Sequence, residues 1–505
     1  MKKILSIYDY CRMPIRISYL GFALLAIGFL IQSESVNIFY TFSNQVIILI
    51  GNACFTLGQT IIVNLPFVFL LSIVSKRANN TFPPILAVIG YVSFLVATIL
   101  FTSSNYNVQY YCDPYSFSSI VGGGHLPIET GLIGTIIVGF ITRFSFIHSR
   151  HRSSYDLMGF LNPDTEALIY NIFLCFLAGM GLSFLFPYFQ KYLQSFIDYI
   201  ATDISDPLRI GLYGFADRLF SLFGLGKLIR YPFWYTSLGG SYTTAAGQTI
   251  LGDVNIWQAI KGVPSSFYGC GRFVAPYYVI NMFMIPAFFI GFLFLFSDRK
   301  ERSGFILPVI FACLFSFICG NPLPMEMLLL VSAPVLYLLY LVLVAVLFGL
   351  LSYLNIYLGC SSAGDSILTV LPGNFPDFII NIRNAAVFDN IVALAVIGAV
   401  MFLICLFLSR FYYHSVSGLS IKNREFYDDL ISGLGGKDNI CSVSSGFLRI
   451  NIGVEDALKA SAESIAELDV GKVSENRDGF SIETGSSSYY VAKKINDMIF
   501  QEDDK

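Results

Sequence analysis

Three ionisable residues in strongly apolar surroundings are the first candidates for chemistry in this chain. Glu326 lies in the run Gly320-Asn-Pro-Leu-Pro-Met-Glu-Met327, and Asp217 and Arg218 lie in the segment 207–229. A carboxylate has two oxygens that accept hydrogen bonds, so it can hold adjacent hydroxyl groups of a solute. Ionisable residues among intramembrane apolar neighbours usually mark such a pathway. We therefore predict that Glu326 binds a solute; the structural alternative is that it caps a hairpin or pairs with Arg218.

The composition around these residues is that of an integral membrane protein. Apolar residues make up 55% of the 505 residues, charged residues make up 13%, and the mean hydropathy is +0.66. These values exclude an ordinary soluble protein, and we expect a lipid membrane and no nucleic acid as the partner. A helix that crosses a bilayer needs about 20 apolar residues. Stretches near this length lie at roughly 17–32, 45–75, 83–102, 128–147, 166–186, 277–297, 304–320, 327–354 and 385–409.

The apolar stretches predict a polytopic α-helical membrane protein with about ten transmembrane helices and re-entrant hairpins. Two stretches, 45–75 and 327–354, are long enough for a span and a further tilted or re-entrant piece. The segment 207–229 is amphipathic, which is typical of a re-entrant hairpin that lines a cavity. Basic residues cluster before the first span, after the fourth and at 298–302, which predicts that both termini are cytoplasmic. No cleavable signal is expected, because the first apolar run lacks a clear cleavage site.

The C-terminal part carries much of the remaining charge and predicts a small cytoplasmic α/β domain. We place the membrane domain at 1–414, a linker at 415–430 and the α/β domain at 431–505. Periodicity predicts a helix at 423–434 that ends at Gly435-Gly436, and an alternating strand within 440–452. An amphipathic helix at 453–468, a strand at 479–483 and a closing helix at 489–500 are expected to follow.

Cysteine and histidine patterns give no metal or cofactor site. The ten cysteines are scattered, mostly within apolar spans, and none forms a CxxC pair. The four histidines show no metal-binding arrangement, since His148 and His151, the only close pair, lie in a basic loop. We therefore predict no metal and no cofactor.

The longest motif in the chain resembles the sugar-permease (EIIC) domain of the glucose-type family of the bacterial phosphotransferase system. It reads GLYGFADRLFSLFGL from Gly211, and continues downstream as SYTTAAGQTILGDV, which ends at Val254. Asp217 stands where the family usually has glutamate. A pair of family histidines near the sugar is replaced by Gly226 and Lys227. The resemblance implies a sugar substrate and a dimeric permease domain.

Further segments resemble other signatures of the same family. The family motif G-I-T-E-P-I-E-F places carboxylates at the sugar; here the first is Leu323 and the second survives as Glu326, with Asn321 as a polar substitute nearby. Asn64-Leu-Pro66 resembles the family's N-M-P. His125, followed by Glu129-Thr-Gly131, resembles H-x-x-D-T-G, and His125 is either a plain loop residue or part of the substrate pathway. The resemblance thus implies a substrate site of six residues: Glu326, Asn321, Arg218, Asp217, His125 and Lys227.

The tail resembles the phosphorylated EIIB domain but departs from it at the reactive position. The run GLGGKDNI from Gly433 matches, and a gap-free alignment places Gly446 at the family's phosphocysteine. A thiolate is the nucleophile in that chemistry, so no catalytic residue is predicted. Ser444, Ser445 and Arg449 are the candidates for a phosphate cradle. Cys441 lies five residues too early and is interpreted as an ordinary packed cysteine.

Three functions remain open from the sequence. The first is a sugar transporter of the EIICB type in the bacterial cytoplasmic (inner) membrane, whose phosphoryl group comes from a separate EIIA or EIIB carrier. As an enzyme it would be a protein phosphohistidine–sugar phosphotransferase. The second is a transporter that works without phosphorylation. The third is a membrane sensor or partner subunit that does not transport. A homodimer is expected from the resemblance.

Overall fold

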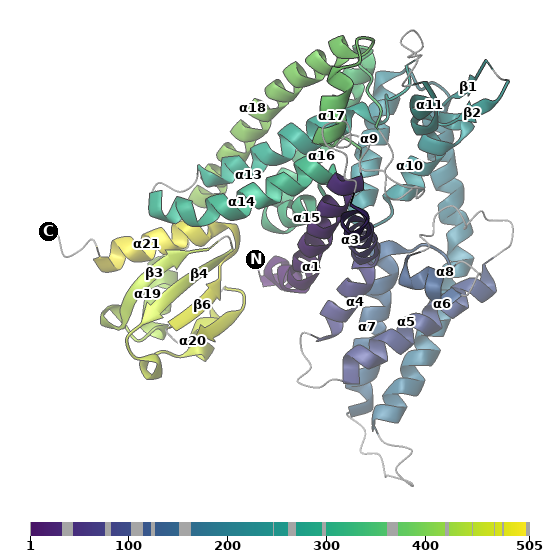
Figure 1. The fold of residues 1–505 in the computed structure, drawn as a ribbon. Helices are drawn as coiled ribbons and strands as arrows, with labels where there is room; N and C mark the ends of the chain where they lie inside the picture. Colours follow the sequence, from purple (N-terminus) through teal and green to yellow (C-terminus); the bar gives the residue numbers. More distant parts are fainter. Residues whose placement is uncertain are drawn as a thin grey trace.

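The structure is a computed structural model that describes most of the chain. The described residues are 2–32, 44–75, 82–102, 115–122, 127–150, 163–245, 247–260, 269–294, 299–360, 372–419, 424–446, 448–468, 470–476 and 479–500. The predicted helical membrane protein with a small strand-containing C-terminal domain is confirmed (Figure 1).

Eight helical segments of the described residues are long and apolar enough to cross a bilayer. They are α1 (Lys2–Gln32), α3 (Gln45–Val63), α5 (Phe82–Phe101), α7 (Gly131–Arg150), α8 (Pro163–Ala201), the continuous run α12–η3–α13 (Ala275–Val279, Ile280–Met284 and Ile285–Leu293), α16 (Pro334–Tyr353) and α18 (Phe388–Leu419). Other helices include α4 (Leu65–Ser75), α6 (Phe117–Gly122), α14 (Arg299–Cys319, of which Phe305–Cys319 is apolar), α15 (Leu323–Ser332) and α17 (Phe375–Ile382).

The two longest apolar stretches are each divided into a long and a short helix, α3 with α4 and α15 with α16. Asn64 caps α3 at the first break, where its amide nitrogen donates to the carbonyl of Thr60 at 2.8 Å. The same side chain holds the segment before α6, because it donates to the carbonyl of Tyr115 at 2.9 Å and accepts from the N–H of Phe117 at 2.6 Å. The second break falls at Ala333, directly before Pro334, which favours the first turn of α16. The short helix α4 therefore begins at the first break, and the short helix α15 ends at the second.

The segment predicted as a hairpin forms two helices, α9 (Pro207–Leu222) and α10 (Gly226–Tyr235). Their 16 and 10 residues are too few to span a bilayer. Gly224 makes the turn between them with a φ of 75°, a conformation that favours glycine. Helix α9 packs against α16 on one side and contacts α8, which packs against α5.

The motif that follows the hairpin forms a separate small element. Strands β1 (Ser241–Thr243) and β2 (Thr249–Leu251) pair antiparallel and lead into α11 (Asp253–Ile260). The strands project from the body of the molecule (Figure 1). Asp253 at the start of α11 is buried, and its Oδ1 accepts a hydrogen bond from the N–H of Gly271 at 2.7 Å.

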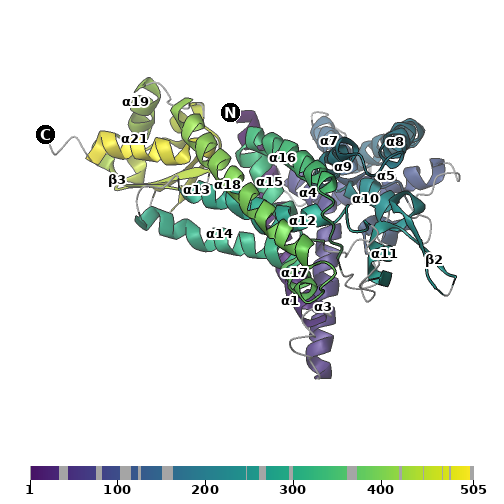
Figure 2. The same cartoon turned by 90° about the horizontal axis from the view of Figure 1, so that it is seen from above.

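The tail contains a four-stranded antiparallel sheet of order β3-β4-β6-β5. Its elements are α19 (Arg424–Gly433), β3 (Ile440–Ser445), β4 (Arg449–Val454), α20 (Ala462–Glu467), β5 (Val473–Asn476), β6 (Gly479–Glu483) and α21 (Ser488–Phe500). The tail has an apolar core of its own, and it lies beside α13 and α18 in both views (Figures 1 and 2).

Two expectations for the tail are wrong. The strand expected within 440–452 is a hairpin of two strands, because the chain turns at Gly446 and pairs Ser445 with Ile450. The helix expected at 453–468 is confined to α20, since the strand β4 continues to Val454. The strand at 479–483 and the closing helix agree with the prediction.

Asp253 gives the fold a dependence on pH. Helix α11 lies outside the candidate spans, and burial raises the pKa of Asp253 from 3.8 to about 7, although the N–H of Gly271 opposes the shift. The folded protein therefore holds a proton that the unfolded chain loses, so we expect the melting temperature to fall as pH rises from about 4 to 7. Asp253→Asn should flatten this dependence in thermal unfolding of detergent-purified protein. An unchanged slope in the variant would contradict the assignment.

Candidate functional site

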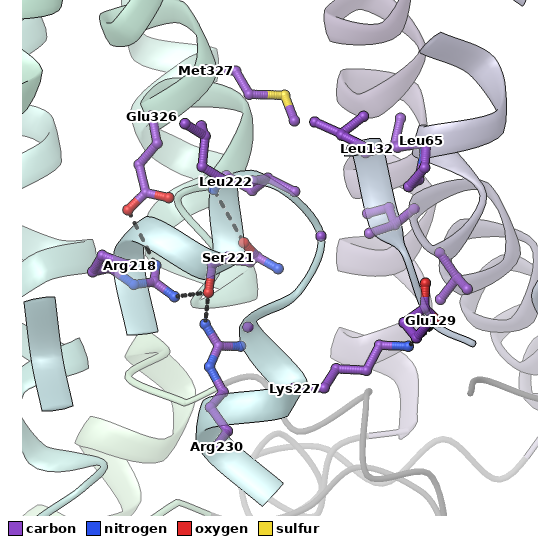
Figure 3. A pocket seen from close by; sticks show the side chains of 17 residues that line it. Leu65, Glu129, Leu132, Arg218, Ser221, Leu222, Lys227, Arg230, Glu326 and Met327 are labelled. Atoms are coloured by element: carbon purple, nitrogen blue, oxygen red, sulfur yellow. Dashed lines mark hydrogen bonds and ion pairs between the residues drawn. The ribbon is translucent and has the colours of Figure 1, made fainter. Parts of the chain in front are cut away.

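A pocket opens between the α9–α10 hairpin and the N-terminal helices (Figure 3). It encloses about 850 Å³, including the part open to solvent. Four segments far apart in the sequence line it: the end of α3 with the start of α4, the stretch before α7, the hairpin, and the start of α15. Polar side chains that line it are Glu129, Arg218, Ser221, Lys227, Arg230, Asn321 and Glu326.

The pocket brings together most of the motifs noted in the sequence. Pro66 comes from the Asn64-Leu-Pro66 motif, Glu129 from Glu129-Thr-Gly131, and Glu326 from the run that begins at Gly320. The YTTAAGQ segment does not reach the pocket, because it forms the projecting β1–β2 hairpin. His125 lies outside the described residues.

A close approach of two backbones fixes one wall of the pocket. The N–H of Leu132 donates to the carbonyl of Phe223 in the hairpin turn at 2.9 Å. Gly131 has a φ of 52°, and a Cβ there would lie 2.2 Å from the same carbonyl oxygen. Only glycine permits this contact. The contact explains the glycine of Glu129-Thr-Gly131 and joins the N-terminal helices to the hairpin.

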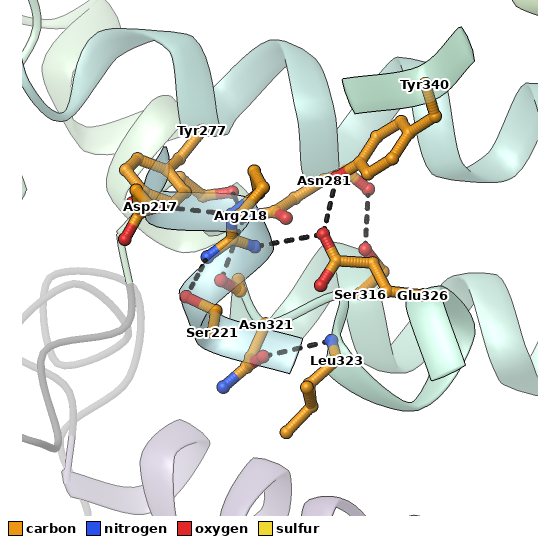
Figure 4. A network of polar contacts seen from close by, with 12 residues as sticks. Asp217, Arg218, Ser221, Tyr277, Asn281, Ser316, Asn321, Leu323, Glu326 and Tyr340 are labelled. Atoms are coloured by element: carbon orange, nitrogen blue, oxygen red, sulfur yellow. Dashed lines mark hydrogen bonds and ion pairs between the residues drawn. The ribbon is translucent and has the colours of Figure 1, made fainter. Parts of the chain in front are cut away.

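Arg218 is the centre of a buried network of charges (Figure 4). Its guanidinium lies 3.1 Å from Asp217 Oδ2 and 3.2 Å from Glu326 Oε1, and all three side chains are almost fully buried. Arg218 and Glu326 are 108 residues apart in the chain. Their ion pair therefore connects the hairpin to α15, and the structural alternative for Glu326, pairing with Arg218, is realised in the structure.

Asp217 is held from two further directions. Arg230 on α10 donates to Asp217 Oδ1 at 2.5 Å, and the hydroxyl of Tyr277 donates to Asp217 Oδ2. Arg230 and Arg218 both donate to the hydroxyl of Ser221, at 2.6 and 3.3 Å. Asp217 does not line the pocket itself. It therefore positions the two arginines that do.

Glu326 has one oxygen in use and one available. Its Oε1 accepts hydrogen bonds from Arg218 at 3.2 Å and from the hydroxyl of Tyr340 at 2.5 Å. Its Oε2 is buried and has no hydrogen-bond partner among the described residues. A buried acceptor without a partner costs about 1–3 kcal/mol. A hydroxyl donor that enters the pocket would remove this cost.

The charges at the pocket balance. Lys227 Nζ lies 3.5 Å from Glu129 Oε2 on the opposite wall. This ion pair bounds the side of the pocket that is remote from Glu326 (Figure 3). Asp217 and Glu326 offset Arg218 and Arg230. A site with no net charge and several hydrogen-bonding groups suits a neutral polar solute better than an ion.

Asn321 and Leu323 occupy the start of α15. Asn321 Oδ1 accepts a hydrogen bond from the N–H of Leu323 at 3.1 Å (Figure 4). This bond caps the beginning of the helix and leaves the amide nitrogen of Asn321 as the group that can donate into the pocket. Leu323 also lines the pocket and offers no acceptor.

The tail candidates gather at the turn between β3 and β4. Ser445 and Gly446 lie on one side of this turn and Arg449 on the other, while Ser444 is exposed on β3. Arg449 forms an ion pair with Glu483 on β6, and the hydroxyl of Ser488 donates to the carbonyl of Gly446 at 2.7 Å. The turn is thus formed and packed against the start of α21, but it carries no thiol.

Cys441 is not a packed residue, as the sequence suggested, but an exposed one. The register of β3 against β4 shifts between Ile440 and Ser442, so Cys441 occupies a β-bulge. It lies at the opposite end of β3 from Gly446, about 16 Å away at 3.3 Å per residue.

Several residues of the network were not found from the sequence. Arg230 could have been noticed as a basic residue that, with Lys227, lies in a short helix of mostly apolar and aromatic residues. Tyr277 and Tyr340 had no such signal, because they are two of 30 tyrosines and their partners lie far along the chain. Ser221 lies one helical turn after Arg218, and only the hairpin geometry shows that both arginines reach it.

Comparison with known proteins agrees with the resemblance along nearly the whole chain. The PTS system glucose-specific EIICBA component of Staphylococcus saprophyticus subsp. saprophyticus is 25% identical over 483 residues, which cover 92% of this chain and 68% of the relative. The chain is a relative of the glucose-type phosphotransferase permeases. No model of a protein family matches the chain. The membrane part is accordingly EIIC-like and the tail EIIB-like.

Two tyrosines of the EIIC-like part provide a matched test of the network. Tyr340 and Tyr337 are both buried, yet only Tyr340 bonds to Glu326, while the hydroxyl of Tyr337 has no partner among the described residues. Removal of the Tyr340 hydroxyl leaves Glu326 less well paired, which should cost about 1–3 kcal/mol. We expect Tyr340→Phe to lower the melting temperature and Tyr337→Phe to leave it unchanged or raise it. Equal losses would contradict the role given to Tyr340.

Proposed function

We propose that this protein is a sugar transporter of the phosphotransferase system, glucose class, and that Glu326 binds the sugar. The observation that carries the proposal is the buried, unpartnered Oε2 of Glu326 at a pocket built from four segments of a chain whose relative is glucose-specific. Sugar hydroxyls are the donors that this oxygen lacks. Asn321 would donate to a sugar oxygen, while Arg218, held by Asp217, would orient the carboxylate.

The balanced charges favour an uncharged sugar over its phosphate. Arg218 and Arg230 are already paired with carboxylates, and Lys227 lies close to Glu129. A free cation for a phosphate group is therefore missing from the described lining. Lys227, which stands in place of a family histidine, would lie at the side of the pocket that receives the sugar. His125 belongs to the same proposed pathway by resemblance alone.

The apolar helices and the relative support a multi-pass protein of the bacterial inner membrane. We place both termini in the cytoplasm, because the basic loops of the sequence point there. The proposed domains are EIIC-like at 1–414, a linker at 415–430 and EIIB-like at 431–505. In the structure α18 continues to Leu419 and α19 begins at Arg424. A homodimer is proposed from the family resemblance.

The phosphoryl group would reach the sugar from another protein. The turn between β3 and β4 is formed, but Gly446 has no side chain to carry a phosphoryl group, and Arg449 is paired with Glu483. A phosphohistidine carrier of the EIIA type would pass the group to the cysteine of a separate EIIB, and that thiophosphate would transfer it to a sugar hydroxyl. Ser444 and Ser445 lack an adjacent base and are proposed only as cradle residues.

The assay for this function measures sugar phosphate formed from phosphoenolpyruvate. Membranes that contain the protein are supplied with general carriers, an EIIA and a separate EIIB, with glucose as the first sugar. We expect Glu326→Gln to reduce product at least about tenfold, because a charge-assisted hydrogen bond is lost. Glu425→Gln on α19, which is exposed, is the matched control and should be silent.

The other functions give different results in that assay. Counterflow of labelled glucose without any phosphodonor would indicate transport without phosphorylation. The absence of both product and counterflow, together with capture of a phosphocarrier by the tail, would indicate a sensor. Either result would contradict the proposed function.

Gly446→Cys tests whether the turn is a vacant phosphocysteine site. Gly446 does not have a positive φ, and a Cβ there would lie 3.1 Å from the carbonyl oxygen of Arg449, so a small shift accommodates a side chain. We expect phosphate label from phospho-EIIA on the variant and none on the wild type, whose Cys441 serves as an internal control. Label on the wild-type protein would show that another residue accepts the group.

A further inference from the structure

A second cavity lies where the EIIB-like tail meets the membrane helices. It encloses about 750 Å³, with open solvent included, and is bounded by the end of α13, the last turns of the α18 span and the first turns of α21. The two parts touch through aromatic residues here. Tyr489 of α21 is 6% exposed and belongs to the same apolar core as Tyr413 of α18.

Three basic side chains line this cavity and indicate that it binds an anion. Arg410, His414 and Lys493 line it, and none of the described lining residues is an aspartate or glutamate. Among the described residues, no ion pair involves Arg410 or Lys493. Two exposed cations, one from the membrane helices and one from the tail, thus face one cavity, and an anion between them could pair with both.

Helix α21 supplies part of the cavity wall and carries Lys493. This helix has 13 residues, and its first turn, which contains Tyr489 and Tyr490, borders the cavity. The turn η6 (Gly485–Ser487) leads directly into α21, and the N–H of Ser488 donates to the carbonyl of Gly485, so the positive potential of the cavity comes from its basic side chains and not from the helix end. A guanidinium and an ammonium group that line one cavity with no carboxylate among the described lining residues form a set that recognises a phosphate group.

We propose that this cavity binds the phosphate group of an anionic molecule and thereby holds the EIIB-like tail against the membrane domain. Arg410 and Lys493 would each contribute from one side. Arg410 and His414 lie in the last turns of the span Phe388–Ser415, at the depth where lipid headgroups lie. Anionic phospholipid is therefore the first source of the phosphate group, and a soluble phosphate compound is the second.

Hydrogen–deuterium exchange of the full chain in lipid nanodiscs tests the site. Three preparations are compared: phosphatidylcholine alone, phosphatidylcholine with phosphatidylglycerol, and phosphatidylcholine with added inorganic phosphate. We expect the backbone amides in the first turns of α21 to exchange more slowly with phosphatidylglycerol, with inorganic phosphate, or with both, than in phosphatidylcholine alone. Protection by the lipid only identifies a headgroup site, and protection by inorganic phosphate only identifies a soluble ligand; both support the proposal.

Variants separate this site from general attraction to the membrane. Arg410→Gln and Lys493→Gln should each shift the anion titration about fivefold, and the double variant about 30-fold, at about 1 kcal/mol for each cation. Lys494→Gln is the matched control, because Lys494 is exposed on the next position of α21 but does not line the cavity. Exchange of β4 reports whether the tail stays folded. Protection that is absent with both anions, or that is unchanged in the single variants, would overturn the proposal.

Discussion

The buried ion pairs of Arg218 determine the candidate site. A guanidinium without contact to water is stable only with carboxylates beside it, and Arg218 has Asp217 from its own helix and Glu326 from α15. The constraint extends outward, since Asp217 also holds Arg230 and Tyr277, and Glu326 also holds Tyr340. The helices α9 and α15, which are too short to span the membrane, are thereby fixed against each other. The pocket is the space that their arrangement leaves open.

The geometry also explains how one carboxylate can be structural and functional together. Oε1 of Glu326 is used by Arg218 and Tyr340, which fix its direction, and Oε2 remains available. A carboxylate held in this way has lost its rotamer freedom before a solute arrives, so less entropy is lost on binding. The leucine at the family's first carboxylate, Leu323, leaves this one oxygen as the main anionic acceptor of the pocket.

Hydropathy and family motifs predicted much of this arrangement, but of the long-range side-chain contacts only the Arg218–Glu326 pair was considered from the sequence. The spans followed from hydropathy and the hairpin at 207–229 from charges in an amphipathic segment. The structure places Glu326, Asp217 and Arg218 in one network, and residues of Asn64-Leu-Pro66 and Glu129-Thr-Gly131 border the pocket. Tyr340 and Tyr277 could not be selected from sequence, because their role depends on a partner more than ten residues away. In the tail, the alternation of residue types along 440–452 did not reveal the turn at Gly446. Two strands joined by a tight turn keep nearly the same two-residue period as one continuous strand.

The position of a bound sugar tests the role of Glu326 most directly. A structure of the protein determined by electron cryomicroscopy with saturating glucose would answer this. We predict sugar density in the pocket between α9, α15 and the start of α7, with a hydroxyl within hydrogen-bond distance of Glu326 Oε2 while Arg218 and Tyr340 remain on Oε1. A sugar bound elsewhere, or a pocket in which Oε2 remains without a ligand, would contradict the central claim.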